Sequence, residues 1–213
     1  MNLLLIGATG MIGQRVLREA VSRGHRVTAV ARNPAKLADS GPLIRAVAGD
    51  LLDSAAMAKL IAGHDAVVSA YSTQGRGGDG LLLNATRSLV TSLRLAHVAR
   101  LIVVGGAGSL EVKPGLALVD TPDFPPAWKQ FALDHRDALP LLEREAADLQ
   151  WTYFSPPAMI QPGERTGRYR TDTKRLVVDA NGASRLSAED YAVALVDELE
   201  HPKHIREQFT AGN

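Results

Sequence analysis

Three glycines near the amino terminus have the spacing that diphosphate binding requires. Gly7, Gly10 and Gly13 follow the apolar run Leu3–Ile6 and open the amphipathic stretch Met11–Ser22. The first allows a sharp strand-to-helix turn, the second lets a diphosphate approach the backbone, and the third lets the helix pack closely on the sheet. Unpaired N–H groups at the start of the helix then face the anion, unless the turn is only a tight connection that binds nothing. The residues expected to bind are Gly7, Ala8, Thr9, Gly10, Met11 and Ile12.

The residue after the second apolar run indicates which dinucleotide would bind. A site for NAD usually places Asp or Glu there, about 20 residues after the glycines, to bind the ribose 2′-hydroxyl. Here Val27–Ala31 is followed by Arg32. A guanidinium can hold a 2′-phosphate through two parallel hydrogen bonds. The sequence therefore predicts NADP(H), with NAD(H) less favoured. The alternative is a solvated arginine at the start of a loop.

Polar groups also follow the next two apolar runs. Asp50 and Leu51 come after the third run, where an Asp can accept a hydrogen bond from an adenine amino group. Ala70, Tyr71 and Ser72 come after the fourth, and we expect them to flank the diphosphate and the nicotinamide ribose. Both assignments rest on position along the predicted sheet, and an Asp after a strand is also an ordinary helix N-cap.

The tyrosines lack the lysine partner that ketone reduction commonly uses. In that device a lysine four residues later lowers the tyrosine pKa, so that the phenol can protonate an alkoxide. Four residues after Tyr71, Tyr153, Tyr169 and Tyr191 stand Gly75, Pro157, Thr173 and Leu195. A reduced flavin instead carries a delocalised anion that can take its proton from water, so a cleft that only holds the rings together is sufficient. The sequence thus favours a flavin or a similar planar acceptor, such as a quinone or a tetrapyrrole.

Two other residues could assist the reaction. Ser109 could donate a hydrogen bond to the acceptor, and His135 could supply a proton. The alternatives are a serine that belongs to a glycine-rich turn and a histidine that lies at a helix surface or cap.

Composition excludes several kinds of site. The 213 residues contain no cysteine, which excludes a disulfide scaffold, a cysteine-ligated metal and a thiol nucleophile. The six histidines show no zincin spacing, so we expect no metal. A formal charge of +1 gives no reason to expect nucleic acid, and no apolar run is long enough to span a bilayer. A cytoplasmic protein is expected.

These residues need a scaffold of alternating strands and helices. Predicted strands are Leu3–Ile6, Val27–Ala31, Leu43–Val47, Ala66–Ala70, Leu101–Val104 and Trp151–Ser155; predicted helices are Met11–Ser22, Ser54–Ile61, Leu81–Ala99, Trp128–Leu149 and Ala188–Leu199. The order predicts an α/β fold: a Rossmann-type, doubly wound parallel sheet in a single domain, 1–213, with a small substrate-side excursion towards the carboxyl terminus. Ser54 and Ser187 are expected N-caps, the latter with Asp190 as a weak capping box, and Gly24 is expected to end the first helix. The glycine-rich stretch 74–80 is expected to form a cleft loop.

The whole pattern resembles the atypical short-chain dehydrogenase/reductases, in particular the NAD(P)H-flavin reductase-like and biliverdin/flavin reductase-like branch, with NmrA-like proteins more distant. The likeness is carried by Gly-Ala-Thr-Gly at 7–10, Arg32-Asn33-Pro34, Gly49-Asp50, His64-Asp65, Ser109, Asp134-His135, Ser155-Pro156-Pro157, Thr166–Tyr169 and Ser187–Asp190. It implies that the segment Ser155 to Ala158 touches the nicotinamide carboxamide and that Ser109 lies near hydride transfer. Gly105, Ser155, Pro156 and Pro157 are therefore added to the expected cofactor contacts. The chain departs from the family at Ala158, often His, in the 74–80 loop, and at Gly105-Gly106.

Two functions from different classes remain open at this stage. One is an NADPH-dependent reductase of a flavin or similar acceptor; the other is a non-enzymatic NADP-binding redox sensor of the NmrA-like type. Both keep the nucleotide site, so motifs do not separate them. A monomer and a homodimer are both compatible with the sequence.

Overall fold

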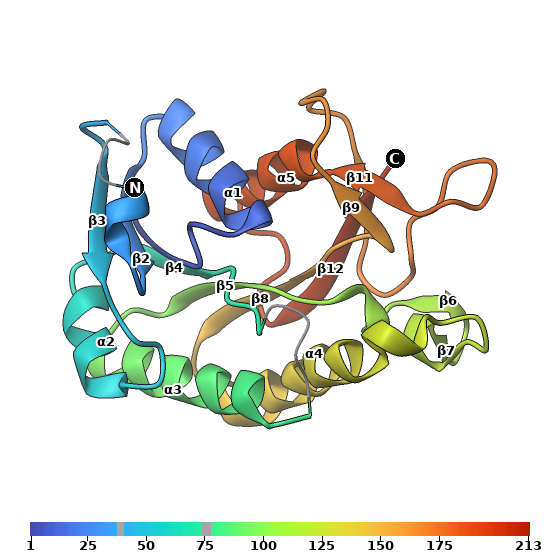
Figure 1. Ribbon diagram of the computed structural model, residues 1–213, viewed down its shortest axis with the longest axis horizontal. Helices are drawn as coiled ribbons and strands as arrows, with labels where there is room; N and C mark the ends of the chain where they lie inside the picture. The colour runs from blue at the N-terminus through green and yellow to red at the C-terminus, as the bar shows by residue number, and fades with distance from the viewer. Residues whose placement is uncertain (38–40, 74–77) are drawn as a thin grey trace.

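The computed structural model describes residues 1–37, 41–73 and 78–213. An eight-stranded sheet runs through the molecule in the order β10-β12-β8-β5-β4-β1-β2-β3, and every neighbouring pair is parallel except β10 with β12 (Figure 1). Its strands are β1 Asn2–Ile6, β2 Arg26–Ala31, β3 Ile44–Ala48, β4 Ala66–Ser69, β5 Arg100–Val104, β8 Gln150–Ser155, β10 Arg170–Asp172 and β12 Glu207–Gly212. The six predicted strands are confirmed as β1, β2, β3, β4, β5 and β8.

The chain winds outwards from the centre of the sheet in two directions. From β1 it passes to β2 and β3 on one side, and it then crosses back to β4, β5 and β8 on the other. The strand order therefore reverses between β1 and β4, and ligands of open α/β sheets bind at the carboxyl ends of the strands at such a switch point.

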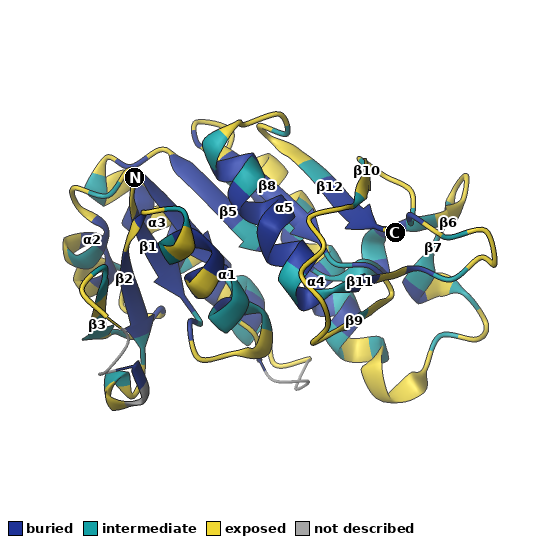
Figure 2. Cartoon of the chain, turned by 90° about the horizontal axis from the view of Figure 1, so that it is seen from above, coloured by how far each residue is buried: buried dark blue, intermediate teal, exposed yellow. Residues whose placement is uncertain are grey.

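Helices cover both faces of the sheet. Figure 1 shows α1 (Met11–Ser22) and α5 (Ala188–Glu200) on one face, and α2 (Ser54–Ile61), α3 (Leu81–Ala96) and α4 (Pro126–Glu145) on the other. Side chains alternate along β1, so that Leu3 and Leu5 join the core under α1 and α5, whereas Leu4 and Ile6 join the core under the other three helices. This burial on both faces, visible as the dark central strands of Figure 2, explains why the strands read as unbroken apolar runs.

Several short elements between the main strands and helices were not predicted. They are the strands β6 Glu111–Lys113, β7 Leu116–Ala117, β9 Met159–Gln161 and β11 Arg185–Ser187, and the 3-10 helices η1 Pro34–Leu37, η2 Ala107–Ser109 and η3 Leu118–Asp120. β12 and β10 were also missed. β12 has polar residues at its first two positions and adds to the sheet beside β8, so its pattern lacks the apolar run that identified the other strands.

Two predicted helices were too long. α3 ends at Ala96 instead of Ala99, because His97 adopts a left-handed conformation (φ 56°) and Val98 N–H bonds back to the Leu93 carbonyl. α4 starts at Pro126 and ends at Glu145, and not at Trp128 and Leu149; a proline is well suited to the first position of a helix.

The helix-end predictions were partly correct. Gly24 has φ 81° and follows α1, as expected. The N-cap of α2 is Asp53 and not Ser54, since the Asp53 carboxylate accepts the N–H of Ala56 at 3.0 Å. Ser187 caps α5 by accepting the N–H of Asp190 at 3.0 Å.

Asp190 does not complete the expected capping box. Its carboxylate instead accepts the backbone N–H groups of Thr166 and Gly167, at 2.8 and 2.7 Å. It therefore fastens the 163–169 loop to the start of α5.

Within the described residues, no helix combines the length and the apolar character that a membrane span needs.

Candidate functional site

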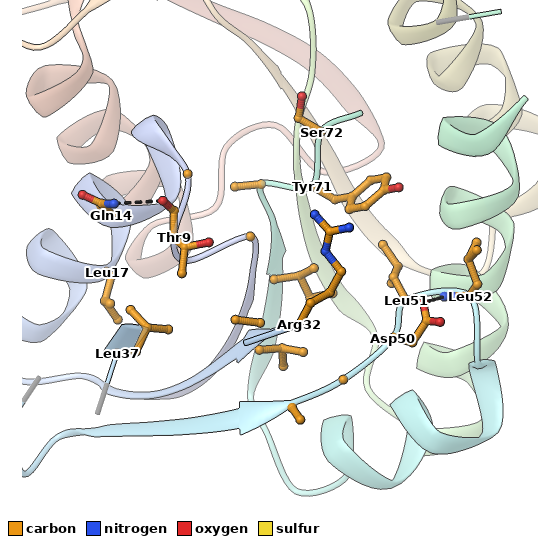
Figure 3. A pocket seen from close by; sticks show the side chains of 18 of the residues that line it. Thr9, Gln14, Leu17, Arg32, Leu37, Asp50, Leu51, Leu52, Tyr71 and Ser72 are labelled. Carbon is orange, nitrogen blue, oxygen red and sulfur yellow. Dashed lines mark hydrogen bonds between the residues drawn. The ribbon is translucent and has the colours of Figure 1, made fainter. Parts of the chain in front are cut away.

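A cleft with a volume of about 1320 Å³ opens at the carboxyl ends of β1, β2, β3 and β4 (Figure 3). Nine of the predicted site residues line it: Gly7, Thr9, Gly10, Arg32, Asp50, Leu51, Ala70, Tyr71 and Ser72. They come from four separate connections between strand and helix. The structure thus brings together the motif glycines, Arg32, and the residues that the sequence selected by their position after the third and fourth strands.

Two of the three motif glycines are required by the fold itself. Gly7 has φ 79°, and a Cβ there would lie 2.4 Å from the Ala70 carbonyl oxygen. A Cβ on Gly13 would lie 2.1 Å from the Gly7 carbonyl oxygen. Side chains at these positions would collide with backbone, so the turn, the helix and β4 can approach one another only with glycine present.

Gly10 is different, because the fold alone does not demand a glycine there. Its φ of −75° is open to any residue, and a Cβ would meet only the Gly7 carbonyl oxygen, at 3.3 Å. The missing side chain leaves the backbone beside the cleft uncovered. The fold does not explain a glycine at position 10, whereas a diphosphate that must approach this backbone does.

The start of α1 is also open to an anion. Gly10 is the N-cap and makes no side-chain capping bond, in contrast to Asp53 at α2 and Ser187 at α5. The first N–H groups of a helix have no partner within it and carry partial positive charge. Gln14 bonds through its side-chain amide to the Thr9 carbonyl at 2.8 Å, which helps to hold the turn. The glycine turn, the uncapped helix and the size of the cleft fit a dinucleotide.

Three motif residues do not line the cleft with their side chains. Ala8 is fully buried in the core, Ile12 packs against that core, and Met11 points to solvent with 38% exposure. Any contact that they make with a diphosphate would come from their backbone N–H groups.

Two arginines, Arg18 and Arg32, line the end of the cleft beside β2 and α1, which is called the outer end below. Arg32 extends from the end of β2 across the cleft towards Tyr71 (Figure 3), and it makes no salt bridge with another described residue. Arg18 on α1 also lines the cleft and was missed. The signal was present, since Gln14, Leu17 and Arg18 lie three to four residues apart and therefore share one helix face.

The alternative interpretation of Asp50, an ordinary helix N-cap, is wrong. The α2 cap is Asp53, and the Asp50 carboxylate instead accepts the N–H of Leu52 at 3.0 Å in an exposed turn. Because Asp50 is exposed and lines the cleft, its carboxylate can accept a further hydrogen bond from a ligand.

The remaining predicted residues lie outside this cleft. Gly105 and Ser109 follow β5, further along the same sheet edge; Ser155 ends β8, Pro156 and Pro157 follow it, and His135 lies on α4. The predicted loop 74–80 falls mostly outside the described residues; of its described part, the Gly78 N–H donates to the buried Asp134 carboxylate at 2.8 Å.

Packing explains why glycines stand at 105 and 106. A Cβ on Gly105 would lie 2.1 Å from the ring of buried Tyr153, and one on Gly106 would lie 2.8 Å from the Cβ of His135. The Tyr153 hydroxyl donates to the His135 carbonyl at 2.5 Å. The departure from the family at 105–106 therefore accommodates an aromatic ring under the sheet edge.

Ser109 and Ser155 share a partner that the sequence did not reveal. The Gln208 amide nitrogen donates to Ser109 Oγ at 2.6 Å and to Ser155 Oγ at 2.8 Å. Ser155 is fully buried, whereas Ser109 is half-buried. Gln208 was missed because the strand that carries it, β12, was missed.

His135 is neither a surface residue nor a helix cap. It is 5% exposed, the Phe131 ring lies edge-on at 4.6 Å, and its Nε2 has no hydrogen-bond partner in the described structure. Burial lowers the pKa of His135 to about 4. The imidazole is therefore neutral at pH 7.

Among the described residues, no three His, Asp or Glu side chains come together in a way that could hold a metal ion. His64, part of the resemblance motif, bonds through Nε2 to Thr28 Oγ1 at 2.8 Å and through Nδ1 to the Ile61 carbonyl at 3.0 Å. Its neighbour Asp65 accepts the N–H of Asn2 at 2.6 Å. These two residues brace the amino-terminal edge of the sheet, opposite the cleft.

The low pKa of His135 predicts a pH-dependent loss of stability. The folded protein holds the ring neutral, so its contribution is complete above the unfolded pKa of about 6.5 and is lost as the pH falls towards 4. Between pH 7.5 and pH 5 the free energy of unfolding should fall by about 2 kcal/mol more in the wild type than in His135→Gln, as measured by urea unfolding. Equal losses in both proteins would contradict this origin.

Comparison with known proteins agrees with this geometry. A profile of the NAD(P)H-binding family matches residues 7–202. The uncharacterised protein YwnB of Bacillus subtilis (strain 168) is 39% identical over 213 residues, which cover 99% of this chain and 97% of that protein.

Two crystal structures are similar over the full chain. A Burkholderia pseudomallei protein described as exported is 49% identical, with a TM-score of 0.91 and complete coverage of both chains. SP1627 of Streptococcus pneumoniae TIGR4, a candidate NADH-flavin reductase, is 34% identical, with a TM-score of 0.87 and coverage of 100% and 99%. The cytoplasmic location stays a prediction. The resemblance to flavin-reductase-like, atypical short-chain dehydrogenase/reductases is confirmed, and the chain belongs to the NAD(P)H-binding family.

Proposed function

We propose that this protein is an NADPH-dependent reductase of a flavin or a similar planar acceptor. The observation that carries the proposal is Gly10: the fold does not require a glycine there, yet its bare backbone lies beside an uncapped helix start in the cleft. Arg32, in place of an acid at the end of β2, favours a 2′-phosphate and hence NADPH over NADH. Arg18, on the other wall of the cleft, provides a second cation.

The state of the tyrosines favours an acceptor that needs no dedicated acid. The Tyr153 and Tyr191 hydroxyls are buried and donate to the carbonyls of His135 and Phe154, and burial raises the pKa of both phenols. The Tyr169 hydroxyl donates to the carboxylate of Asp197 on α5. Of the four tyrosines only Tyr71 lines the cleft. The neutral His135 is also a weak proton donor.

Flavin reduction suits such a site. NADPH supplies a hydride, the oxidised flavin takes up that hydride with one proton from water, and NADP⁺ and reduced flavin result. The protein residues then bind and orient the two rings and exclude competing geometries. The similarity to a candidate NADH-flavin reductase supports this acceptor class. An NADP-binding redox sensor is the alternative, and catalytic turnover distinguishes the two.

The glycine turn gives the sharpest test of the nucleotide site. In Gly10→Asp the new carboxylate would be a good N-cap for α1, so the free energy of unfolding should change by less than about 0.5 kcal/mol. The same carboxylate would repel a diphosphate, and NADPH affinity should fall at least about 30-fold, or about 2 kcal/mol. Urea unfolding and fluorescence titration measure the two effects. A stable variant with wild-type NADPH affinity would refute the site.

The 2′-phosphate role is tested at Arg32. Arg32→Ala should weaken NADPH binding by about 1.5–3 kcal/mol, as expected for a lost charge-assisted contact, and leave NADH affinity nearly unchanged. Arg26→Ala, at the opposite end of the same strand, is the matched control and should affect neither nucleotide. Equal losses for NADPH and NADH in Arg32→Ala would show that Arg32 does not read the phosphate.

The acceptor class is tested by NADPH consumption with flavin mononucleotide. If the acceptor needs no positioned acid, Ser109→Ala should slow turnover by no more than about 10-fold, or about 1.4 kcal/mol of barrier. His135→Ala should have a smaller effect. Loss of a dedicated acid would cost about 100-fold or more. A fall of that size with nucleotide affinity intact would contradict the proposal, and absence of turnover by the wild type with any flavin or quinone would favour the sensor.

A further inference from the structure

Gln208 bonds both Ser109 and Ser155, at the part of the sheet edge that lies outside the cleft. It lies on β12, a strand that carries no sequence motif. β12 pairs with β8 in parallel, with Gln208 opposite Tyr153 and Thr210 opposite Ser155. Phe209 packs into the core under α1 and α5, so the alternating Gln208 points to the face that α4 covers. η2, which carries Ser109, lies on that same face, where a Cβ on Gly108 would meet Ala132 of α4 at 3.1 Å.

The direction of these hydrogen bonds matters for chemistry. The Gln208 amide has two N–H donors and gives one to each serine oxygen, at 2.6 and 2.8 Å. A hydroxyl that accepts such a bond must direct its own hydrogen elsewhere. In the described structure neither Ser109 nor Ser155 donates to a protein group.

Of the two serines, only Ser109 has surface exposed to solvent. Ser155 is fully buried and therefore anchors the Gln208 amide from inside the protein. Ser109 is half-buried, at the end of the sheet edge that β4, β5 and β8 form. With Arg32 in its proposed role at the 2′-phosphate, the adenosine half of a dinucleotide would lie over β2 and β3, and the reacting half would extend in this direction.

We propose that Gln208 is a positioning residue that makes Ser109 a hydrogen-bond donor to a carbonyl oxygen attached to a ring at the reacting end of the site. This inference rests on the proposed function for its reaction. The carbonyl belongs either to the carboxamide of the nicotinamide or to the acceptor, because a flavin carries a carbonyl beside the ring atoms that are reduced and a quinone is reduced at its carbonyls. In either case the bond to Ser155 holds the Gln208 side chain in place. The bond from Gln208 to Ser109 then leaves the Ser109 hydroxyl hydrogen free to donate to the ligand.

The test is a substitution that keeps the shape of the side chain at position 208 but replaces its hydrogen-bond donor with an acceptor. Gln208→Glu places a carboxylate, which only accepts hydrogen bonds, where the amide donated; both serine hydrogens would then turn towards it. Gln208→Met keeps the length without imposing a direction. Each change is made in the wild type and in Ser109→Ala, and thermal unfolding and the affinity for 2′,5′-ADP, which lacks the nicotinamide half, monitor the fold.

Two measurements distinguish the two sources of the carbonyl. If the acceptor supplies it, Gln208→Glu should lower kcat/KM for flavin mononucleotide by about 3- to 10-fold, close to the loss in Ser109→Ala, and Gln208→Met by about 2-fold at most. If the nicotinamide supplies it, Gln208→Glu should weaken NADPH by a similar factor with 2′,5′-ADP affinity unchanged. In the Ser109→Ala background, Gln208→Glu should have no further effect on either quantity.

Three results would overturn the inference: wild-type values for Gln208→Glu in both measurements, equal losses in Gln208→Glu and Gln208→Met, or an undiminished effect of Gln208→Glu in the Ser109→Ala background. If the wild type reduces flavin and Gln208→Glu changes neither kcat/KM nor NADPH affinity, the proposed function is retained and the role of Gln208 is rejected. A wild type that reduces no acceptor, but whose Gln208→Glu variant selectively loses NADPH affinity, rejects the proposed function and keeps the role.

Discussion

The close approach of two strand ends governs the rest of this structure. The Gly7 turn passes so near the end of β4 that any side chain at Gly7 would meet the Ala70 carbonyl oxygen at 2.4 Å, and α1 then lies on that turn through Gly13. β1 and β4 are neighbours at the point where strand order reverses, so this contact fixes the floor of the cleft. It also aims the start of α1 across the floor. The fold itself therefore selects two of the motif glycines, and the third is left for a ligand to explain.

Beyond this floor, the two ends of the site follow different physical rules. The outer end carries Arg18 and Arg32, exposed and without ion pairs to other described residues, as suits a phosphate that must be drawn from water. The end near η2 is built by packing: Gly105 and Gly106 are small because Tyr153 and His135 occupy the space beneath them. Hydroxyls and an amide meet there, in the bonds of Gln208 to Ser109 and Ser155, beside an imidazole that burial keeps neutral.

The sequence predicted the parts of this arrangement that local pattern controls. Parallel strands buried on both faces give unbroken apolar runs, and the carboxyl ends of the first four runs marked residues that do line the cleft, as Arg32 and Asp50 illustrate. β12 could not be found in this way, because its residues Glu207 and Gln208 are polar and its pairing with β8 is a long-range contact. Gln208 was lost with it. The ligand contacts of Ser155 and Ser109 stay predictions, since they depend on a molecule that the chain pattern does not encode.

Helix ends show a second reason why the structure differs from the sequence prediction. Ser54 is as good a capping residue as Asp53 in isolation, and only the backbone path decides which of the two carries the cap. At α5 Ser187 and Asp190 do not complete the capping box, because the Asp190 carboxylate is bonded to the N–H groups of Thr166 and Gly167. Local rules identify groups that can bond, while tertiary structure chooses their partners.

The side chains around η2 bear on the reaction itself. Reduction of an isolated ketone creates a basic oxygen, and a site for it needs an acid near the reacting atoms. Close to η2 lie a serine held by an uncharged amide, a buried tyrosine whose pKa is raised, and a histidine that is neutral at pH 7. Such groups can orient a ring by hydrogen bonds but release protons poorly. A planar acceptor that spreads its negative charge and collects its proton from water matches what these side chains can do, and the cations at the far end are then free to hold the nucleotide.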